Sequence, residues 1–240
     1  MALSDGLVAY WKHDESSGNR ADEVGTATLI DNGSVGSTTG GINNGSLFDA
    51  TPTKYFSVTN SALNVQSSFS FSFFASTDNT GRTARVLTGY GGSNNGRLEL
   101  FQASDGSLRI AYYNSGGSRT YKWAASAFPS TGVLYHFVVA VEASTNDVKI
   151  YRNGTSLTIT NYQASASALG DNSGVYAMGG FVGGTDTWDG VLDEFGFWNR
   201  QLSATEASDI YNSGSVLSYD DITGGPAPTP KNPLFMGGGL

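Results

Sequence analysis

Two short segments near opposite ends of the chain most constrain how it folds: GLVAYWKHDESSGN at 6–19 and WDGVLDEFGFWNRQLSATE at 188–206. Each has the pattern of a strand that opens or closes an all-β domain, and each carries an acidic cluster. In the second, residues 191–198 lead into Ser203 and Glu206, and a serine followed three residues later by a glutamate is a capping box. We therefore expect strands at both ends of the domain and one short helix ending near Gly214.

Further strand patterns recur between these segments. Strict alternation in 69–75 places Phe69, Phe71 and Phe73 on one face, which is the buried one if the intervening serines face water. Asn153-Gly154 between two strand patterns predicts a type I′ hairpin. Roughly a dozen strands and one short C-terminal helix predict an all-β, two-sheet antiparallel jelly-roll sandwich.

Composition narrows the functions that such a chain can have. The 13 Phe and 12 Tyr can fill a substantial core, and 32 Gly supply turns. A net charge of −8 without a basic patch argues against binding of nucleic acid or anionic membranes. The roughly 18-residue apolar run of a membrane helix is absent, so we expect no membrane insertion. With no cysteine, neither a disulfide nor a thiolate metal site can form.

Together, the two terminal segments resemble the laminin G-like, concanavalin A-like domain family, of the kind found in phage and bacterial surface proteins. Its members open with GLVAYW-x-x-DE-x-SG and close with DG-x-x-DE-x-x-x-x-NR-x-LS-x-x-E, and the resemblance covers residues 5–214. We assign 1–214 to this jelly-roll domain and 215–240 to an extended Pro/Gly-rich tail. The fold hosts lectins, adhesins, enzyme accessory modules and some glucanases, so the resemblance alone does not give a function.

A glucanase needs two carboxylates that face one sugar cleft. The nearest match is DGVLDE at 189–194, where Asp193 and Glu194 are adjacent on a strand and therefore point to opposite faces, and Asp189 lies in the preceding turn. His13 and His136 are the chain's two histidines, and no Ser-His-Asp arrangement is evident. We predict a protein that is not an enzyme.

The acidic clusters suggest a cation. Asp193 shares its strand face with apolar residues, and a buried carboxylate needs a hydrogen-bonded partner or a metal. The family resemblance implies one structural Ca²⁺, and Asp14, Asp22 and Asp193 lie where its ligands would be expected. Carboxylates and backbone carbonyls of a tight loop are ligands that calcium prefers. Alternatively, these acids cap turns and pair with Arg20 or Arg200.

Glycan sites combine aromatic rings with planar polar side chains, because sugars present both C–H faces and hydroxyl edges. Three predicted loops, at 90–97, 113–123 and 185–188, contain both kinds of residue. The candidate glycan-binding residues are Tyr90, Asn94, Tyr113, Arg119, Tyr121, Trp123, Asp186 and Trp188. The alternative is that these are the rim aromatics and turn residues of an ordinary sandwich.

The C-terminal segment combines a stiff proline spacer with an apolar end. The residues are Pro226, Pro228, Pro230, Leu234, Phe235 and Met236. We predict that this segment is an assembly peptide, which docks onto a neighbouring subunit or another virion protein.

The start of the chain, MALSDG, has no basic or apolar signal-peptide region, so we expect synthesis in the cytoplasm without a secretory signal. Incorporation into a virus particle released by lysis would explain this start, the missing cysteines and the tail. The sequence thus favours a virion surface protein, a capsid decoration or tail- or fibre-associated protein that binds cell-surface glycans. The alternative is an extracellular bacterial lectin-like adhesion or carbohydrate-binding module, and a glycoside hydrolase is least favoured.

Overall fold

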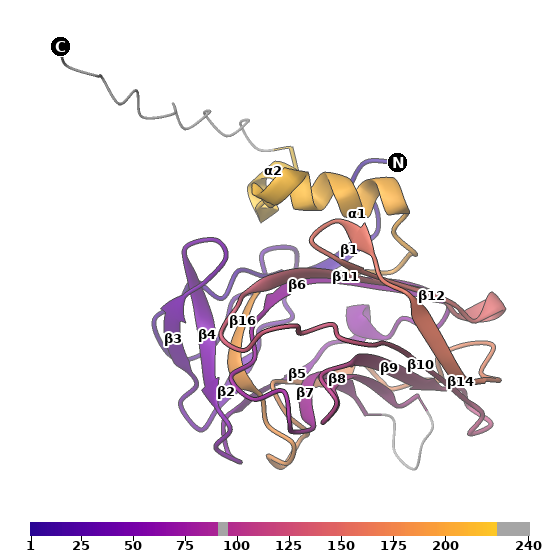
Figure 1. Cartoon of the computed structure of the whole chain (residues 1–240), viewed down its shortest axis with the longest axis horizontal. Coiled ribbons are helices and arrows are strands. Elements are labelled where there is room, and N and C mark those ends of the chain that lie inside the picture. Colours follow the sequence, from indigo (N-terminus) through magenta and orange to yellow (C-terminus); the bar gives the residue numbers. More distant parts are fainter. Residues whose placement is uncertain (91–95, 225–240) are drawn as a thin grey trace.

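The computed structural model describes residues 1–90 and 96–224, and it consists of two antiparallel sheets stacked face to face with helices outside one of them (Figure 1). The first sheet runs in the order β13 (Thr155–Ser156), β12 (Asp147–Arg152), β11 (Tyr135–Glu142), β6 (Ser68–Ala75), β16 (Asp189–Trp198), β4 (Asn44–Asp49) and β3 (Gly36–Thr39), and β1 (Leu7–Trp11) also pairs with β16. The predicted all-β jelly-roll sandwich is confirmed.

The second sheet runs in the order β14 (Ile159–Ala164), β10 (Arg119–Ala124), β9 (Leu108–Tyr113), β8 (Leu98–Gln102), β7 (Ala84–Gly89), β15 (Val175–Met178), β5 (Tyr55–Thr59) and β2 (Ile30–Asn32). Helical segments are α1 (Ala204–Tyr211) and α2 (Tyr219–Ile222), with 3₁₀ turns at η1 (Ser61–Leu63), η2 (Ala143–Thr145) and η3 (Asn212–Gly214). Within the described ranges, no helix is long and apolar enough to cross a membrane.

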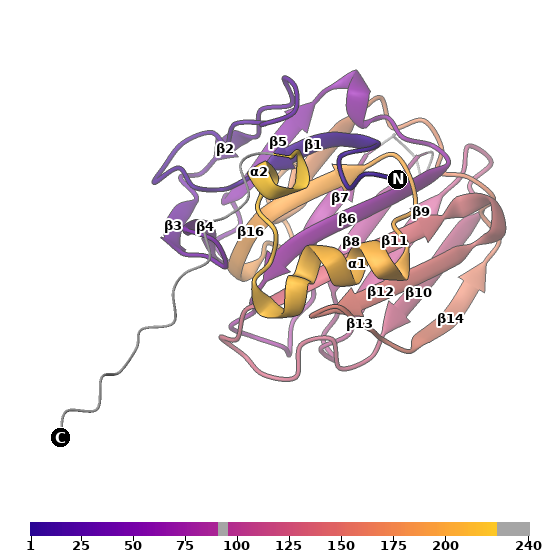
Figure 2. The same cartoon turned by 90° about the horizontal axis from the view of Figure 1, so that it is seen from above.

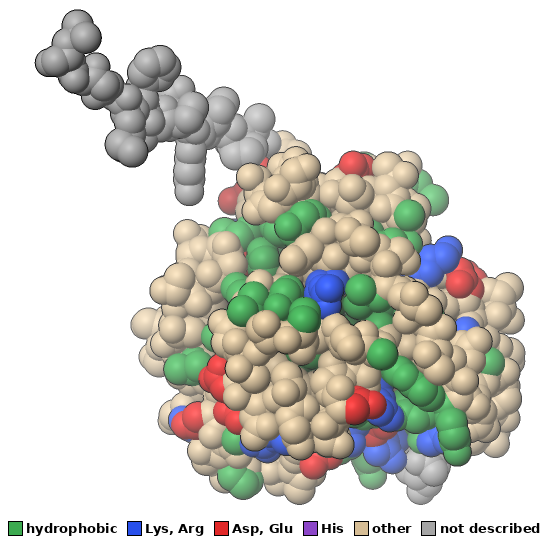
Figure 3. All heavy atoms as spheres, viewed as in Figure 1, with side chains coloured by type: hydrophobic (Ala, Val, Ile, Leu, Met, Phe, Trp, Pro, Cys, Tyr) green, Lys and Arg blue, Asp and Glu red, His purple; other side chains and the backbone are tan. Residues whose placement is uncertain are grey.

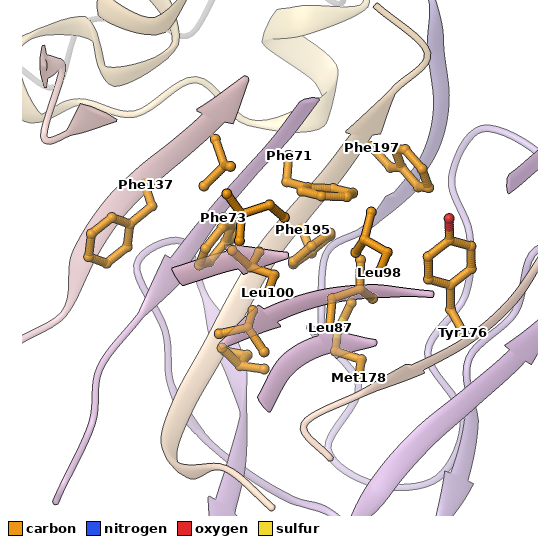
Figure 4. Packing of buried hydrophobic residues seen from close by; sticks show 14 of the residues in the cluster. Phe71, Phe73, Leu87, Leu98, Leu100, Phe137, Tyr176, Met178, Phe195 and Phe197 are labelled. Atoms are coloured by element: carbon orange, nitrogen blue, oxygen red, sulfur yellow. The ribbon is translucent and has the colours of Figure 1, made fainter. Parts of the chain in front are cut away.

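The main core lies between the two sheets and is rich in aromatic rings (Figure 4). Phe69, Phe71 and Phe73 of β6 are all fully buried, as their alternation predicts. The Phe73 ring stacks on that of Phe195 at 5.2 Å, and Leu100 comes to the same core from the second sheet. Burying a phenylalanine contributes about 2–3 kcal/mol, so this layer holds the sheets together.

The serines of β6 do not face water, contrary to the sequence expectation. Ser70 and Ser72 are buried because the C-terminal segment covers the outer face of the first sheet. The Ser70 hydroxyl donates to the carbonyl of Arg200 at 2.8 Å and accepts from the Leu202 amide at 2.9 Å. Figure 2, which looks onto this face, shows both helices lying across it.

A second, smaller apolar cluster fills the space beneath these helices. Its buried members are Tyr10, Val138, Ala140, Tyr151, Trp198, Leu202, Ala207, Ile210 and Ile222. The capping box predicted at the start of α1 is present, with the Ser203 hydroxyl accepting from the Glu206 amide and the Glu206 carboxylate accepting from the Ser203 amide. The cap fixes the residue at which the chain, after leaving β16, begins the helix that covers the outer face of the first sheet.

The domain extends further than the sequence predicts. Residues 215–224 were assigned to the extended tail, but Ser218 caps the one-turn helix α2, and Leu217 and Ile222 pack in the small cluster. The boundary at residue 214 is therefore wrong for this stretch. The tail residues Pro226, Pro228, Pro230, Leu234, Phe235 and Met236 lie outside the described residues.

Strands β1 and β16, the first and last of the chain, pair antiparallel, with Trp11 opposite Phe195. One local prediction is confirmed. At the predicted hairpin, Arg152 pairs with Thr155 across Asn153 (φ 50°) and Gly154 (φ 71°), the two positive φ values that a type I′ turn requires.

Candidate functional site

The outer face of the second sheet carries arginines and aromatic rings in alternation. On β9, Leu108 and Ile110 point into the core, so Arg109 and Tyr113 point outward. We call this surface the Arg–aromatic face, and it consists of Arg85, Arg97, Phe101, Arg109, Tyr113, Arg119, Tyr121, Trp123, Tyr162 and Phe181. Figure 3 shows basic, acidic and hydrophobic side chains close together along the lower edge, where this sheet lies in Figure 1.

Strand register arranges these side chains in rows across the sheet. In one row Arg85 of β7 lies opposite Phe101 of β8, Phe101 opposite Arg109 of β9, and Arg109 opposite Trp123 of β10. In another row Tyr113 lies opposite Arg119.

Between these rows, Tyr121 lies opposite the small side chain of Ala111. Opposite residues on one face have Cβ atoms about 5 Å apart, which brings each guanidinium against its neighbouring rings.

Each of the four arginines lies over at least one ring of the face. The guanidinium carbon of Arg85 is 4.3 Å from the centroid of Phe101 and 4.5 Å from that of Phe181. Arg109 lies 5.2 Å from the ring of Trp123. Such cation–π contacts contribute about 0.5–1 kcal/mol each at exposed sites and hold the planar groups in fixed orientations.

Carboxylates fix some of these arginines further. Arg109 donates to Asp105 Oδ2 at 2.6 Å, to Ser107 Oγ at 2.7 Å and to the Tyr121 hydroxyl at 2.6 Å. Partial burial acts to raise the pKa of Asp105, but the hydrogen bonds from Ser107 and Arg109 outweigh it and leave that pKa lowered. The ion pair therefore stays formed at neutral pH, and it holds Tyr121 in place.

A hollow of about 450 Å³ adjoins the face at Phe181. It is lined by Thr88, Tyr90, Val175, Phe181, Val182 and Thr185. Mostly apolar walls with a few hydroxyl groups are typical of small-ligand sites. The hollow adjoins the rows of rings and guanidinium groups at Phe181, whose ring also lies against Arg85.

Four of the predicted glycan residues are brought together on this face, although on strands rather than in a loop. Tyr113 ends β9, and Arg119, Tyr121 and Trp123 share the outward side of β10. The sequence interpretation placed them in one long loop, whereas they form two strands joined by a tight turn at 114–118.

The remaining predicted residues have different places. Tyr90 lines the hollow, and Asp186 pairs with Arg85 at 3.0 Å, which holds Arg85 over its two rings. Asn94 lies outside the described residues. Trp188 is 0% exposed, and its indole N–H donates to the carbonyl of Ser76 at 3.0 Å. Because Trp188 is a core residue, its assignment to a glycan site is wrong.

Several residues of the face were not predicted: Arg85, Phe101, Arg109, Tyr162 and Phe181. The period-two pattern of SLRIAYY at 107–113 could have identified Arg109, because Leu108, Ile110 and Tyr112 alternate with it. Tyr162, which is 67% exposed, is placed 5.7 Å from Tyr121 by the pairing of β14 with β10. No local pattern predicts that pairing.

The acidic cluster at 193–194 is buried rather than exposed. A bulge in β16 gives Glu194 a positive φ of 48°, and the Tyr10 hydroxyl donates to its Oε2 at 2.6 Å. Burial raises the pKa of Glu194 to about 8 and that of Asp193 to about 7. With exposures of 3% and 0%, neither carboxyl group reaches a surface ligand in this conformation.

The predicted three-acid calcium set is not assembled. Asp22 caps a loop, accepting hydrogen bonds from the amides of Tyr10, Val24, Gly25 and Ala27. Across 1–90 and 96–224, no group of three or more His, Cys, Asp or Glu residues is placed to hold a metal ion. Asp22 is thus the turn-capping residue of the alternative interpretation.

Asp14 and Asp193 interact electrostatically: burial is the main cause of the raised pKa of Asp193, and the negative charge of Asp14 raises it further. Asp193 Oδ2 accepts from the amides of Gly41 and Ile42, whereas its buried Oδ1 has no hydrogen-bond partner. A Cβ on Gly40 would lie 2.4 Å from Oδ2, so that side of the carboxylate is closed. The orphaned Oδ1 is an unpaired acceptor, and calcium at Asp193 and Asp14 stays a prediction.

Comparisons with known proteins identify the family. A model of the concanavalin A-like lectin/glucanases superfamily matches residues 49–208, about two thirds of the chain. The chain belongs to this superfamily. Its jelly-roll domain has no sequence match among curated proteins.

Several solved structures are similar to this chain in fold. The botulinum neurotoxin serotype G binding domain matches with a TM-score of 0.70 at 12% identity, covering 85% of this chain and 50% of that one. Domain 4 of the GH43 arabinanase AbnA of Geobacillus stearothermophilus, solved with arabinotriose, matches at 0.59 and 18% identity, covering 85% and 98%.

The Trypanosoma rangeli sialidase matches at 0.63 and 17% identity, covering 90% and 34%. The chain thus spans about half the length of the neurotoxin domain and a third of the sialidase. At these identities the likeness establishes the fold alone.

Proposed function

We propose that the protein is a non-enzymatic glycan-binding module and that the Arg–aromatic face is its binding surface. The observation that carries this proposal is the arrangement of rings and guanidinium groups in fixed rows on an outward sheet face. Ring faces pack against sugar C–H groups, and guanidinium and carboxylate groups hydrogen-bond sugar hydroxyls. Two similar structures were solved with saccharide ligands, arabinotriose for the arabinanase domain and N-acetylneuraminic acid for a botulinum neurotoxin serotype D domain.

The burial of Asp193 and Glu194 supports a binding function over hydrolysis. A glycosidase needs two carboxyl groups on either side of the scissile bond. The carboxyl groups of Asp193 and Glu194 are instead enclosed by the loop 40–42 and by Tyr10.

The test is binding to a panel of immobilised polysaccharides by wild-type protein and by Tyr121→Ala. We expect the substitution to lower affinity about two- to tenfold, since a stacked ring contributes about 0.5–1.5 kcal/mol. Tyr135→Ala is the matched control, because Tyr135 is also a partly buried tyrosine under an arginine, 5.4 Å from Arg152, but on the first sheet. If no polysaccharide is bound even at high valency, or if both variants lose binding equally, the proposal fails.

We further propose that the module acts on a virion surface, as a capsid decoration or a tail- or fibre-associated protein anchored by the segment after residue 224. Single shallow sites bind weakly, and repetition on a particle raises avidity by orders of magnitude. The alternative is a bacterial, extracellular adhesion or carbohydrate-binding module. Particle fractionation separates the two: co-purification with virions at a fixed copy number supports the first, and absence from purified virions removes it.

A further inference from the structure

The Arg–aromatic face differs in charge from the rest of the molecule. Its four arginines are accompanied by three carboxylates, from Glu99, Asp105 and Asp186. The remainder of the chain carries nine basic against eighteen acidic residues. An anionic ligand is therefore repelled by most of the surface and meets a slight excess of positive charge here.

The four arginines differ in their ionic partners. Arg85 and Arg97 both pair with Glu99, and Arg109 pairs with Asp105. Arg119, in contrast, takes part in none of the ion pairs formed by residues 1–90 and 96–224.

The segments 91–95 and 225–240 contain no Asp or Glu that could pair with Arg119. Its excess positive charge is thus not matched by any acidic side chain of the described structure.

Neutral contacts hold this guanidinium at the surface. Its carbon lies 5.2 Å from the ring centroid of Tyr121, 5.8 Å from that of Tyr162 and 5.9 Å from that of Tyr113. Nε donates to Gln163 Oε1 at 3.2 Å, and Nη1 makes a long 3.5 Å contact with the Tyr113 hydroxyl. A guanidinium that is oriented by rings but not neutralised presents its fork of N–H donors to a ligand, and the geometry of that fork matches a carboxylate.

We propose that the Arg–aromatic face binds saccharides that carry a carboxylate, such as uronic or sialic acids, and that Arg119 receives the carboxylate. This inference rests on the proposed glycan-binding function. The sugar ring would lie against the exposed ring of Tyr162 beside Arg119, while the exposed carboxylate of Asp105 accepts hydrogen bonds from hydroxyl groups further along the face.

Single-stranded nucleic acid is the rival ligand, because it also uses rings interleaved with cations. Each nucleotide, however, adds a phosphate, and the carboxylates of Glu99, Asp105 and Asp186 are interspersed among the arginines. A polyanion that tracks the whole face meets repulsion at each of these points, whereas one carboxylate at Arg119 does not.

The experiment compares binding of the full chain to galacturonate, which carries a single carboxylate, and to its methyl ester, which has the same ring without charge. Galactose 6-sulfate and oligo-dT test sulfate and phosphate as the recognised group. The variants are Arg119→Gln and, as a matched control, Arg82→Gln, which removes the same charge from a residue paired with Asp189 away from the rows. Thermal melting confirms that each variant is folded.

We expect wild-type protein to bind galacturonate about tenfold more tightly than the ester at low salt, since a charge-assisted hydrogen bond is among the strong ones and a factor of ten corresponds to about 1.4 kcal/mol. Arg119→Gln should abolish this preference, so that acid and ester bind with equal affinity, whereas Arg82→Gln should retain the preference. Equal binding of acid and ester, or a preference that survives in Arg119→Gln, overturns the inference while leaving the glycan-binding function standing. Tighter binding of galactose 6-sulfate or oligo-dT than of galacturonate also overturns it, and failure to bind any saccharide removes the proposed function itself.

Discussion

The Tyr10 hydroxyl donates a 2.6 Å hydrogen bond to Glu194 Oε2, and this bond joins the first strand of the chain to the last. Both side chains are buried, so neither group can turn to water if its partner is removed. We predict that Tyr10→Phe lowers the free energy of unfolding by about 1–3 kcal/mol, the cost of leaving a buried polar group unsatisfied.

Urea denaturation measures this loss. Tyr219→Phe is the control, since the Tyr219 ring lies 5.3 Å from that of Tyr10 but its hydroxyl donates to Glu23 at an exposed position. Equal losses in the two variants would contradict the importance of the buried bond.

The second prediction concerns acid stability. Burial lowers the pKa of His136 to about 3, and the ring stacks on Tyr211 of α1 while Nε2 contacts Ser72 Oγ at 2.9 Å. The unfolded chain takes up a proton near pH 6.5 that the folded chain does not accept until about pH 3, so stability falls as the pH drops through this window.

Between pH 6.5 and 4.5 this effect amounts to about 2 kcal/mol. His136→Gln should therefore lose about that much less stability than wild type over the same interval, measured from urea midpoints at both pH values. Parallel losses in the two proteins would show that His136 does not cause the acid sensitivity.

The third prediction concerns Trp123 and Trp188, which the sequence analysis assigns to the same glycan site. Trp188→Ala should destabilise the fold by about 3–5 kcal/mol, because it opens a cavity between Phe128 and Ser76. Trp123→Ala should change stability by less than about 1 kcal/mol but weaken polysaccharide binding, because Trp123 lies on the surface beside Arg109. Melting and binding measured on the same samples check both, and the reverse pattern would refute the assignment.

The fourth prediction concerns calcium. If Asp193 and Asp14 hold a cation only in the folded state, Ca²⁺ at a hundredfold excess over its Kd should add about 2.7 kcal/mol of stability relative to EDTA. Asp193→Asn should remove the difference between the two conditions. An unchanged melting midpoint, with no metal found by elemental analysis, would end the hypothesis.

The fifth prediction follows from the cluster beneath α1 and α2. A chain ending at Gly224 keeps Leu217 and Ile222 in place, so its melting temperature should equal that of the full-length protein. A chain ending at Gly214 instead exposes the apolar surface around Tyr10. Losing the buried side chain of Ile222 and the partly buried one of Leu217 should cost about 2–4 kcal/mol. Equal melting of both truncated chains would contradict a structural role for 215–224.

The fold followed from the sequence because its signals are local and repeated. Alternation in β6 shows which side chains are buried, and Ser203 and Glu206 mark the start of α1 without any knowledge of the rest of the chain. Alternation does not show what covers the opposite side of a strand, which is why Ser70 was expected to face water. The one-turn helix α2 is too short for its periodicity to be recognised.

The site was predicted only in part, since it depends on pairings between distant strands. Tyr121 and Trp123 alternate along β10 and could be grouped from sequence. Arg85 joins this face only because β7 pairs with β8, and Phe181 joins it only because the folded chain brings its ring against Arg85. The sequence predicts a loop at both Trp123 and Trp188, because residues typical of turns precede each of them. Whether such a ring points outward or into the core depends on strand position, as the buried Trp188 shows.

The helices cover the outer face of the first sheet only, so the two outer faces of the sandwich differ. Asp5 and Arg200 meet beside α1, and residues 219–224 follow on the same side, whereas the Arg–aromatic face lies on the opposite side of the sandwich. Attachment to a larger body through either end of the described chain would therefore leave the Arg–aromatic face turned away from that body. Copies fixed side by side in this way would present an array of outward-facing Arg–aromatic faces, with no rearrangement of the domain needed to expose them.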